Sequence, residues 1–364
     1  MDLNHHLNSL LLVFSILLGF LIGGIVVSII CNKLLLSFSQ SLGIRNKNDI
    51  TIRWSNQSKP SLGGISFFIV FLFSSIAFSI VFYDQNIFHN KEYLGLISAG
   101  CLSFLMGLAD DAYNTKPLIK LGVQIACGVL FVLTGTIIDL THVFYVDALL
   151  TVVWVIVIMN SLNMLDNMDG ITATTVVFVL SSCLASGWIF NGFDFDLWTI
   201  LLISMIGGLL GFLKFNIHPS KIFMGDAGSQ FIGLFVAFFA VKFLWNVGPY
   251  TENHSWVGIV IGLVALTPAA ADTLTVVINR LKRGQSPMVG GKDHTTHHLV
   301  YAGFKDIQVW YVFLAIGSVA FLLVIVMLFM VKSAIIYPIA LFAIYFVLVF
   351  GYLYRNTIKF PEKK

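Results

Sequence analysis

Long apolar stretches separated by short polar segments are the feature that most constrains how this chain can fold. Each stretch has about 17–25 residues, and at about 1.5 Å per residue a helix of that length crosses the hydrocarbon core of a bilayer. Asp, Glu, Lys and Arg make up only 11% of the chain, against about 25% in soluble proteins. A disordered chain and an ordinary soluble enzyme are therefore excluded.

We predict an all-α, polytopic membrane protein: a bundle of about eleven transmembrane helices in a single domain spanning residues 1–364. The predicted spans are 10–31, 62–82, 92–108, 118–138, 143–159, 171–190, 197–215, 229–247, 256–277, 309–331 and 335–354.

The distribution of Lys and Arg predicts the orientation of the bundle. With the N-terminus outside, 18 of the 21 Lys and Arg residues fall in cytoplasmic segments, and only Lys91, Lys242 and Lys332 fall on the opposite side. This positive-inside bias predicts an external N-terminus and a cytoplasmic C-terminus. The cytoplasmic segments also crowd Asp, Asn, Gly and His, so an active site is expected on that face. They lie near 32–61, 109–117, 160–170, 214–228 and 278–308.

An acid pair, Asp110 and Asp111, follows the third predicted span. Adjacent carboxylates at a helix C-terminus oppose the helix dipole and disfavour each other's ionisation. They are either two solvated interfacial acids or a pair that serves divalent-metal or phosphate chemistry.

A second polar run joins the fifth and sixth spans and contains Asn160, Asn163, Asp166 and Asp169. If the run is helical, the first three share one face because they are three residues apart. One interpretation is a turn capped by Asn and Asp side chains. The other is a set of oxygen ligands and amide donors that face a polar ligand.

A third run extends from Asn216 to Ser229 and frames Asp226 between Gly225 and Gly228. Glycine lets backbone N–H groups approach a phosphate where a helix begins. The run lacks the Gly-Lys-Ser/Thr of a Walker A loop. A helix cap by Asp226 or Ser229 is the alternative.

A basic, histidine-rich segment contains Arg283, His294, His297 and His298. His294 and His298 are four residues apart and could share a helix face, which would also suit zinc. The oxygen-rich runs favour Mg²⁺ or Mn²⁺ instead. We prefer a phosphate-binding segment, with binding to anionic lipid as the alternative. Asp272, near membrane depth and four residues after a helix-breaking Pro268, is a further functional candidate.

Together with Lys59-Pro-Ser-Leu-Gly-Gly and Lys120-Leu-Gly-Val-Gln124, these pieces occur in the order seen in one family. From about residue 58 to 298, the sequence resembles the polyprenyl-phosphate N-acetylhexosamine-1-phosphate transferases. Two departures stand out. Asn167 replaces a glycine of the usual Asp-Gly-x-Asp-Gly, and Asp-His-Thr-Thr-His-His replaces the usual His-x-His-His.

The resemblance implies ten or eleven spanning helices in a bacterial inner membrane, with a cytoplasmic active site. A UDP-N-acetylhexosamine would give its sugar 1-phosphate to undecaprenyl phosphate and release UMP. Asp110, Asp111 and Asp226 would be catalytic, and Asp226, Asp110 and Asn163 would surround Mg²⁺, with Mn²⁺ as an alternative. The expected substrate-binding residues are Lys59, Lys120, Asn160, Asn163, Asp166, Asp169, Asn216, Arg283, His294, His297 and His298.

Two branches of the family differ in the sugar. The Pro268-Ala-Ala-Ala-Asp272-Thr and Arg283-Gly-Gln-Ser-Pro287 segments resemble the branch that makes undecaprenyl-diphospho-N-acetylglucosamine for surface polysaccharides. Transfer of phospho-N-acetylmuramoyl-pentapeptide is the alternative. A transporter or flippase and a non-catalytic homologue are the rivals from other classes. No nucleic-acid partner is expected, and a homodimer stays open.

Overall fold

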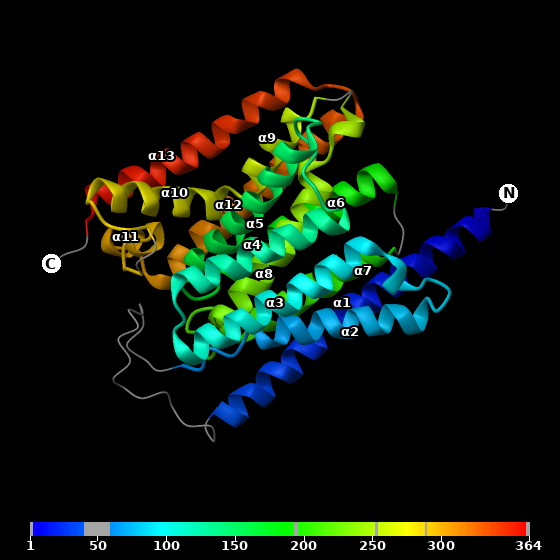
Figure 1. Ribbon diagram of the computed structural model, residues 1–364, viewed down its shortest axis with the longest axis horizontal. Coiled ribbons are helices and arrows are strands. Elements are labelled where there is room, and N and C mark those ends of the chain that lie inside the picture. Colours follow the sequence, from blue (N-terminus) through cyan, green and yellow to red (C-terminus); the bar gives the residue numbers. More distant parts are fainter. Residues whose placement is uncertain (1–2, 40–58, 193–195, 252–253, 288–289, 362–364) are drawn as a thin grey trace.

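The computed structural model describes residues 3–39, 59–192, 196–251, 254–287 and 290–361, and within them every regular element is helical (Figure 1). The prediction of an all-α membrane-type fold is therefore confirmed. The α-helices are α1 (Leu3–Ser39), α2 (Ile65–Val81), α3 (Lys91–Tyr113), α4 (Pro117–Thr134), α5 (Phe144–Leu165), α6 (Ile171–Asn191), α7 (Leu197–Asn216), α8 (Gly225–Ala240), α9 (Trp256–Ala265), α10 (Thr267–Lys282), α11 (Thr295–Tyr301), α12 (Asp306–Lys332) and α13 (Ala343–Lys359). Four short turns of other helix types are η1 (Ile87–His89), η2 (Val241–Trp245), η3 (Gly248–Tyr250) and η4 (Tyr337–Phe342).

Most of the described helices have the length and apolar composition of membrane-spanning helices. Nine spans are long and apolar enough to cross one, and α9 with α10 forms a bent tenth candidate. The apolar helix α2, with 17 residues, is shorter than these. Each of the eleven predicted stretches thus coincides with a helix or with the bent pair, whereas the count of eleven crossings and the orientation stay predictions. Arg45, Lys47 and Arg53 lie outside the described residues.

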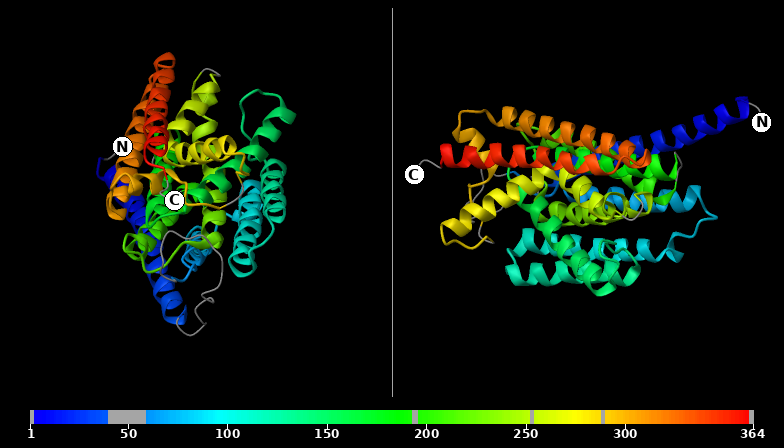
Figure 2. Two further views of the ribbon diagram at one scale, coloured as in Figure 1. Left: turned by 90° about the vertical axis from the view of Figure 1, so that its left-hand side faces the viewer. Right: turned by 90° about the horizontal axis from the view of Figure 1, so that it is seen from above.

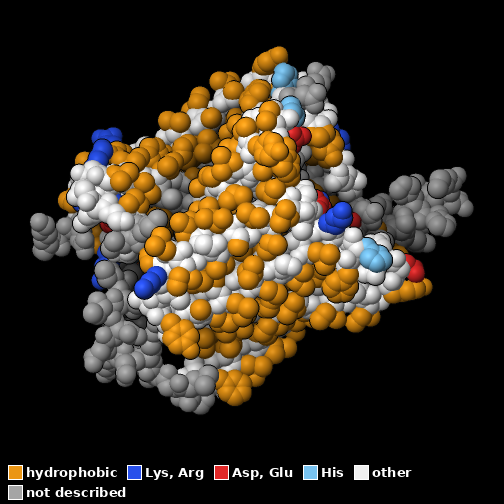
Figure 3. All heavy atoms as spheres, in the orientation of Figure 1, with side chains coloured by type: hydrophobic (Ala, Val, Ile, Leu, Met, Phe, Trp, Pro, Cys, Tyr) orange, Lys and Arg blue, Asp and Glu red, His pale blue; other side chains and the backbone are white. Residues whose placement is uncertain are grey.

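The helices α7 and α8 form the centre of the bundle. The helix α7 packs against α1, α2 and α6, and α8 packs between α3 and α5. Most helices run in roughly the same or opposite directions (Figure 2). Hydrophobic side chains cover most of the face seen in Figure 3, as expected for a surface that meets lipid rather than water.

The predicted span 256–277 is broken rather than continuous. The helices α9 and α10 meet at an angle of 84°, and α10 carries Pro268 in its first turn. Proline has no N–H to donate and its ring clashes with the preceding turn, which explains a break at this position. The bend directs α10 away from the common helix direction (Figure 2).

Two helices extend further than the apolar pattern predicted. The helix α3 continues to Tyr113, so Asp110 and Asp111 lie in its last turn rather than after it. The helix α5 continues to Leu165, which makes Asn160 and Asn163 helical and leaves Asp166 as its C-cap. Polar residues at the membrane interface end an apolar stretch without ending a helix.

Candidate active site

The ends of α3, α5 and α7 and the beginnings of α4 and α8 surround a cavity of about 1190 Å³. Six Asp side chains line it, against the basic side chains of Lys59, Lys120 and Arg280. Most of the predicted site residues lie in this wall: Lys59, Asp110, Asp111, Lys120, Asn160, Asn163, Asp166, Asp169, Asn216, Asp226, His294 and His297. Arg283 and His298 are not among its lining residues.

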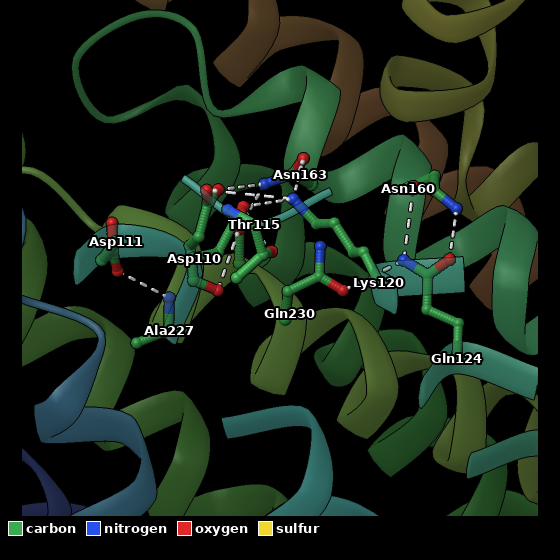
Figure 4. Close-up of polar contacts among 11 residues, drawn as sticks. Asp110, Asp111, Thr115, Lys120, Gln124, Asn160, Asn163, Ala227 and Gln230 are labelled. Carbon is green, nitrogen blue, oxygen red and sulfur yellow. Dashed lines mark hydrogen bonds and ion pairs between the residues drawn. The ribbon is translucent and has the colours of Figure 1, made fainter. Parts of the chain in front are cut away.

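Asp110 is held at the turn between α3 and α4 (Figure 4). Its Oδ1 accepts hydrogen bonds from the backbone N–H of Thr115 at 2.9 Å and from the Thr115 hydroxyl at 2.6 Å. Its Oδ2 lies 2.9 Å from Nζ of Lys120. That ammonium is also 3.8 Å from Oδ2 of Asp226, so Lys120 contacts both carboxylates.

Asp226 lies in the first turn of α8 and contacts the end of α5. Nδ2 of Asn163 donates to Oδ1 of Asp226 at 2.6 Å and to Oγ of Ser229 at 2.8 Å. The preceding Gly225 has φ of +74°, and a Cβ there would lie 2.3 Å from the carbonyl oxygen of Ser61. Glycine is therefore required where the chain turns into α8.

Asp111 ties α3 to the same turn of α8. Its Oδ2 accepts from the backbone N–H of Ala227 at 2.9 Å (Figure 4). A carboxylate at this position is stabilised by the positive end of the α8 helix dipole. The glycine-framed loop was predicted to present backbone N–H groups to a phosphate or to cap a helix. In the structure, Asp111 supplies a carboxylate to one of these N–H groups.

The loop after α5 carries two further carboxylates. Burial and the nearby carboxylates of Asp226, Asp111 and Asp169 raise the pKa of Asp166 to about 8. Asp169 binds the loop that follows α7: Ser220 donates to it from its N–H at 3.0 Å and from its hydroxyl at 2.7 Å.

Lys59 reaches the same loop from another segment. Its Nζ lies 3.2 Å from Oγ of Ser220 and 5.3 Å from the ring centre of Phe223. Backbone hydrogen bonds from Gly63 to Phe223 and from Gly64 to Met224 dock the Lys59–Gly64 segment on the loop before α8. The Lys-Pro-Ser-Leu-Gly-Gly run therefore lies against the glycine-framed Asp226 despite its distance in sequence.

Asn216 is almost fully buried and acts as a clamp between two loops. Its Oδ1 accepts from the N–H of Gly170 at 3.0 Å, and its Nδ2 donates to the carbonyl of Ile222 at 3.0 Å. Both ends of the amide are thus engaged by backbone. Asn216 was predicted to bind substrate, and this geometry gives it a positioning role next to the cavity.

A network of amides lies beside the acids (Figure 4). Gln124 pairs with Asn160 in both directions, at 3.3 Å and 2.8 Å, and donates to Oε1 of Gln230 at 3.1 Å. Gln124 and Gln230 are buried. This network fixes Asn160 at the cavity wall.

The three histidines of the histidine-rich segment have different surroundings. His294 lies next to Asp272, with 2.9 Å between Nδ1 and Oδ2. Burial and the neighbouring His294 lower the pKa of His297 to about 3. Nδ1 of His298 lies 2.7 Å from the carbonyl of Phe360, beyond α13. Among the described residues, no three His, Cys, Asp or Glu side chains are grouped so that they could hold one metal ion.

Arg280 and Arg283 share one carboxylate. The guanidinium of Arg280 donates to both oxygens of Asp293, at 3.0 and 2.6 Å, and to the carbonyl of Pro287 at 2.9 Å. Arg283 also pairs with Asp293. Burial alone would raise the pKa of Asp293, but the hydrogen bonds and positive charges of the two arginines lower it to about 2.

Known proteins are similar to this chain over most of its length. The sequence model described as "Glycosyl transferase family 4" matches residues 93–244. A probable undecaprenyl-phosphate N-acetylglucosaminyl 1-phosphate transferase of Bacillus subtilis is 29% identical over 300 residues, which cover 80% of this chain and 78% of the relative.

Over residues 93–244, the chain is similar to glycosyl transferase family 4. Two other relatives cover most of the chain as well. A decaprenyl-phosphate N-acetylglucosaminephosphotransferase of Mycolicibacterium smegmatis is 28% identical over 73% of this chain and 71% of its own length. A phospho-N-acetylmuramoyl-pentapeptide-transferase of Streptococcus agalactiae is 27% identical over 72% of this chain and 80% of its own length.

The family match includes the amides of the cavity and five of its six Asp residues, but not Asp306, Lys59 or the histidine-rich segment. The family's shared part therefore coincides with the acid cluster. Sequence reasoning missed Thr115, Ser220 and Asp293, whose partners become evident only in the fold. For Asp293 a signal existed, because an acid directly precedes His294 in the histidine-rich segment.

The donor set near Asp226 suits Mg²⁺. This ion prefers oxygen ligands and is often held by only one or two protein carboxylates, with water and substrate phosphates completing its shell. Asp226 and Asp110 supply carboxylates that both contact Lys120, and Nδ2 of Asn163 donates a hydrogen bond that orients the carboxylate of Asp226. A site with few protein ligands is also compatible with the absence of a three-residue cluster among the described side chains.

Proposed function

We propose that this protein transfers N-acetylglucosamine 1-phosphate from UDP-N-acetylglucosamine to undecaprenyl phosphate and releases UMP. The reaction would be the first membrane step of a surface polysaccharide, on the cytoplasmic face of a bacterial plasma membrane. The observation that carries the proposal is the cluster of Asp110, Lys120, Asn163 and Asp226 at the end of a membrane-type bundle. The name of the Bacillus subtilis relative supports the same reaction.

The chemistry requires charge neutralisation more than proton removal. The second pKa of a phosphate monoester is about 6, so the lipid phosphate is mostly a dianion at pH 7. In the net reaction, one of its oxygens bonds to the sugar-bearing phosphorus of the nucleotide. The bond from that phosphorus to the bridging oxygen breaks, and UMP leaves with the electron pair.

Two anionic substrates would have to meet in an acid-rich cavity, which makes a cation necessary. Asp226 and Asp110, with the amide of Asn163, would hold Mg²⁺, and Mn²⁺ is the alternative. When bound, the ion supplies positive charge to phosphate oxygens. Lys120 contacts both carboxylates, and the same ammonium group can contact a phosphate oxygen.

The experiment is UMP release by purified protein in detergent with undecaprenyl phosphate and Mg²⁺. UDP-N-acetylglucosamine and UDP-N-acetylmuramoyl-pentapeptide are compared, each with and without EDTA. Metal-dependent UMP from the first substrate alone is expected. Release from UDP-N-acetylmuramoyl-pentapeptide alone would instead indicate the function named for the Streptococcus agalactiae relative. No release from either substrate, under conditions in which a relative is active, would contradict the proposal.

A further inference from the structure

The turn after α5 is in contact with an aromatic ring from a helix far along the chain. Gly170, at the end of this turn, is buried and has φ of +77°. A Cβ there would lie 3.0 Å from Cδ1 and Nε1 of Trp310 and 3.4 Å from Cα of Ile217. The indole ring of Trp310, on α12, therefore packs directly against the backbone of the turn.

Hydrogen bonds fix both the ring and the turn. Nε1 of Trp310 donates to the hydroxyl of Thr174 at 2.9 Å, and the N–H of Thr174 donates to the carbonyl of Gly170 at 3.1 Å. The N–H of Gly170 donates to Oδ1 of Asn216 at 3.0 Å. The turn is thus held by Asn216 from α7 and by Trp310 from α12, and the ring cannot leave it without losing its own hydrogen bond.

The residue before the glycine connects this turn to a cation of the cavity. Asp169 accepts from the N–H and the hydroxyl of Ser220, and its Oδ2 lies 3.1 Å from Nδ1 of His218. Oγ of Ser220 in turn lies 3.2 Å from Nζ of Lys59. Asp169 and Lys59 belong to the cavity wall, whereas Trp310 is not among the lining residues. A shift of the turn would therefore move the loop after α7 and, with it, a positive charge of the cavity.

The same helix also contacts the loop after α7. Oδ2 of Asp306, in the first turn of α12, lies 4.0 Å from Nδ1 of His218. Asp306 and Trp310 are four residues apart, so they lie on the same side of α12. This helix is outside the segment 93–244 that matches the family model. Because Asp306 lines the cavity and Trp310 does not, Trp310 can be changed without altering the wall.

We propose that Trp310 is a positioning residue of the candidate active site, whose ring holds the Gly170 turn in place. Through Asp169, this turn sets the position of the Lys59 ammonium at the cavity. The inference rests on the proposed function, because it takes anionic substrates as the ligands that this ammonium serves. It adds to that function a residue that contacts neither substrate.

The first measurement is hydrogen exchange of segment 167–172 in the purified full-length protein. The amide of Gly170 exchanges only when its bond to Asn216 opens. Trp310→Ala removes the ring and should speed this exchange about tenfold or more. Trp310→Phe keeps a ring but loses the N–H, and about fivefold is expected for one neutral hydrogen bond. The matched control is Phe313→Ala, which truncates a fully buried side chain of the same helix and should lower the melting temperature without changing exchange in this segment.

The second measurement is UMP release by Trp310→Ala, Asp169→Ala and the double variant. Trp310→Ala should lower kcat/KM about tenfold or more, because misplacement of about 1 Å can reduce catalysis that strongly. If Trp310 acts through Asp169, the double variant should have a kcat/KM within about twofold of Asp169→Ala alone. Phe313→Ala should stay within about twofold of wild type at a temperature well below its melting point.

Wild-type exchange in Trp310→Ala, additive losses in the double variant, or equal effects of Phe313→Ala would overturn the inference. The proposed function fails separately. If wild-type protein releases no UMP while Trp310→Ala still speeds exchange of segment 167–172, the transferase proposal is contradicted and the hold of Trp310 on the turn is supported. If wild-type protein and Trp310→Ala release UMP equally fast, the transferase proposal is supported and the positioning role is wrong.

Discussion

Nδ2 of Asn163 lies 2.6 Å from Oδ1 of Asp226, which joins the last turn of α5 to the first turn of α8. Replacing Asp226 by Asn keeps the size and an acceptor oxygen but removes the negative charge. We expect turnover to fall by about a hundredfold or more, as for other losses of a preorganised charge in an active site. UMP release measures turnover, and a melting curve shows that the variant is folded.

Ser229→Ala is the matched control for this prediction. It removes the other acceptor of Nδ2 of Asn163, at 2.8 Å, and leaves the carboxylate in place. Its turnover should stay within about threefold to tenfold of wild type, since a neutral hydrogen bond contributes about 1 kcal/mol. A wild-type rate in Asp226→Asn would contradict the assignment of Mg²⁺ to this position.

Lys120 is the second residue whose replacement should be informative. It contacts Asp110 at 2.9 Å and Asp226 at 3.8 Å, so Lys120→Met leaves carboxylates without their neighbouring cation. We expect a lower melting temperature in EDTA and partial recovery with Mg²⁺, which would replace the missing charge. Thermal unfolding with and without the ion measures this. An equal loss under both conditions would show that the lysine does not share its role with a divalent ion.

The amide network gives a prediction about stability. Gln124→Leu leaves polar groups of both Asn160 and Gln230 without their partner. Gln230→Leu removes one acceptor of Gln124 and also a buried Nε2 that has no partner among the described residues. An unsatisfied buried polar group costs about 1–3 kcal/mol. Melting temperatures should therefore fall more in Gln124→Leu, and the opposite order would contradict the network.

Much of the fold was predictable because apolar length is a local property of the sequence. The eleven stretches coincide with helices or with the bent pair, and Pro268 marked the break. Helix ends were less predictable: α3 and α5 continue past the apolar residues because an interfacial Asp or Asn tolerates helical geometry.

The candidate site was predictable as a set of residues but not as a set of contacts. The spacing of His294 and His298 would allow a shared helix face, yet His294 is the N-cap of α11 with extended backbone angles. Its side chain therefore leaves in another direction and contacts Asp272, while His298 contacts the segment after α13. The clamp formed by Asn216 also depends on partners that only the fold brings together.

The buried His297 predicts a pH dependence of stability. Its pKa in the folded protein is about 3, below the ordinary value of about 6.5 that the unfolded chain would show. The unfolded state therefore binds the proton first as pH falls, so His297 makes the protein less stable between about pH 6.5 and 3 and has no such effect above this range. His297→Gln should flatten the fall in melting temperature with acid. The exposed His89→Gln serves as control, and equal acid profiles of both variants would contradict the prediction.

Gly107, which has no side chain, sets how closely α3 approaches α8 and therefore where the acid pair lies. A Cβ on Gly107 would lie 2.3 Å from the carbonyl oxygen of Asp226 and 2.5 Å from Cα of Ala227, both backbone atoms of α8. Asp110 and Asp111 follow three and four residues later, on the same side of α3. Gly107→Ala must therefore push α3 away from α8 and move the acid pair away from Asp226.

We expect Gly107→Ala to cost about 1–3 kcal/mol of stability through overpacking and to lower turnover by tenfold or more, because misplacement of about 1 Å can reduce catalysis that strongly. Gly122→Ala on α4 is the matched control. Its added methyl group would meet no atom within 4 Å, and Ala favours a helix over Gly by about 1 kcal/mol. UMP release and melting curves compare the two variants. Normal turnover in Gly107→Ala would show that the distance between α3 and α8 does not set the chemistry.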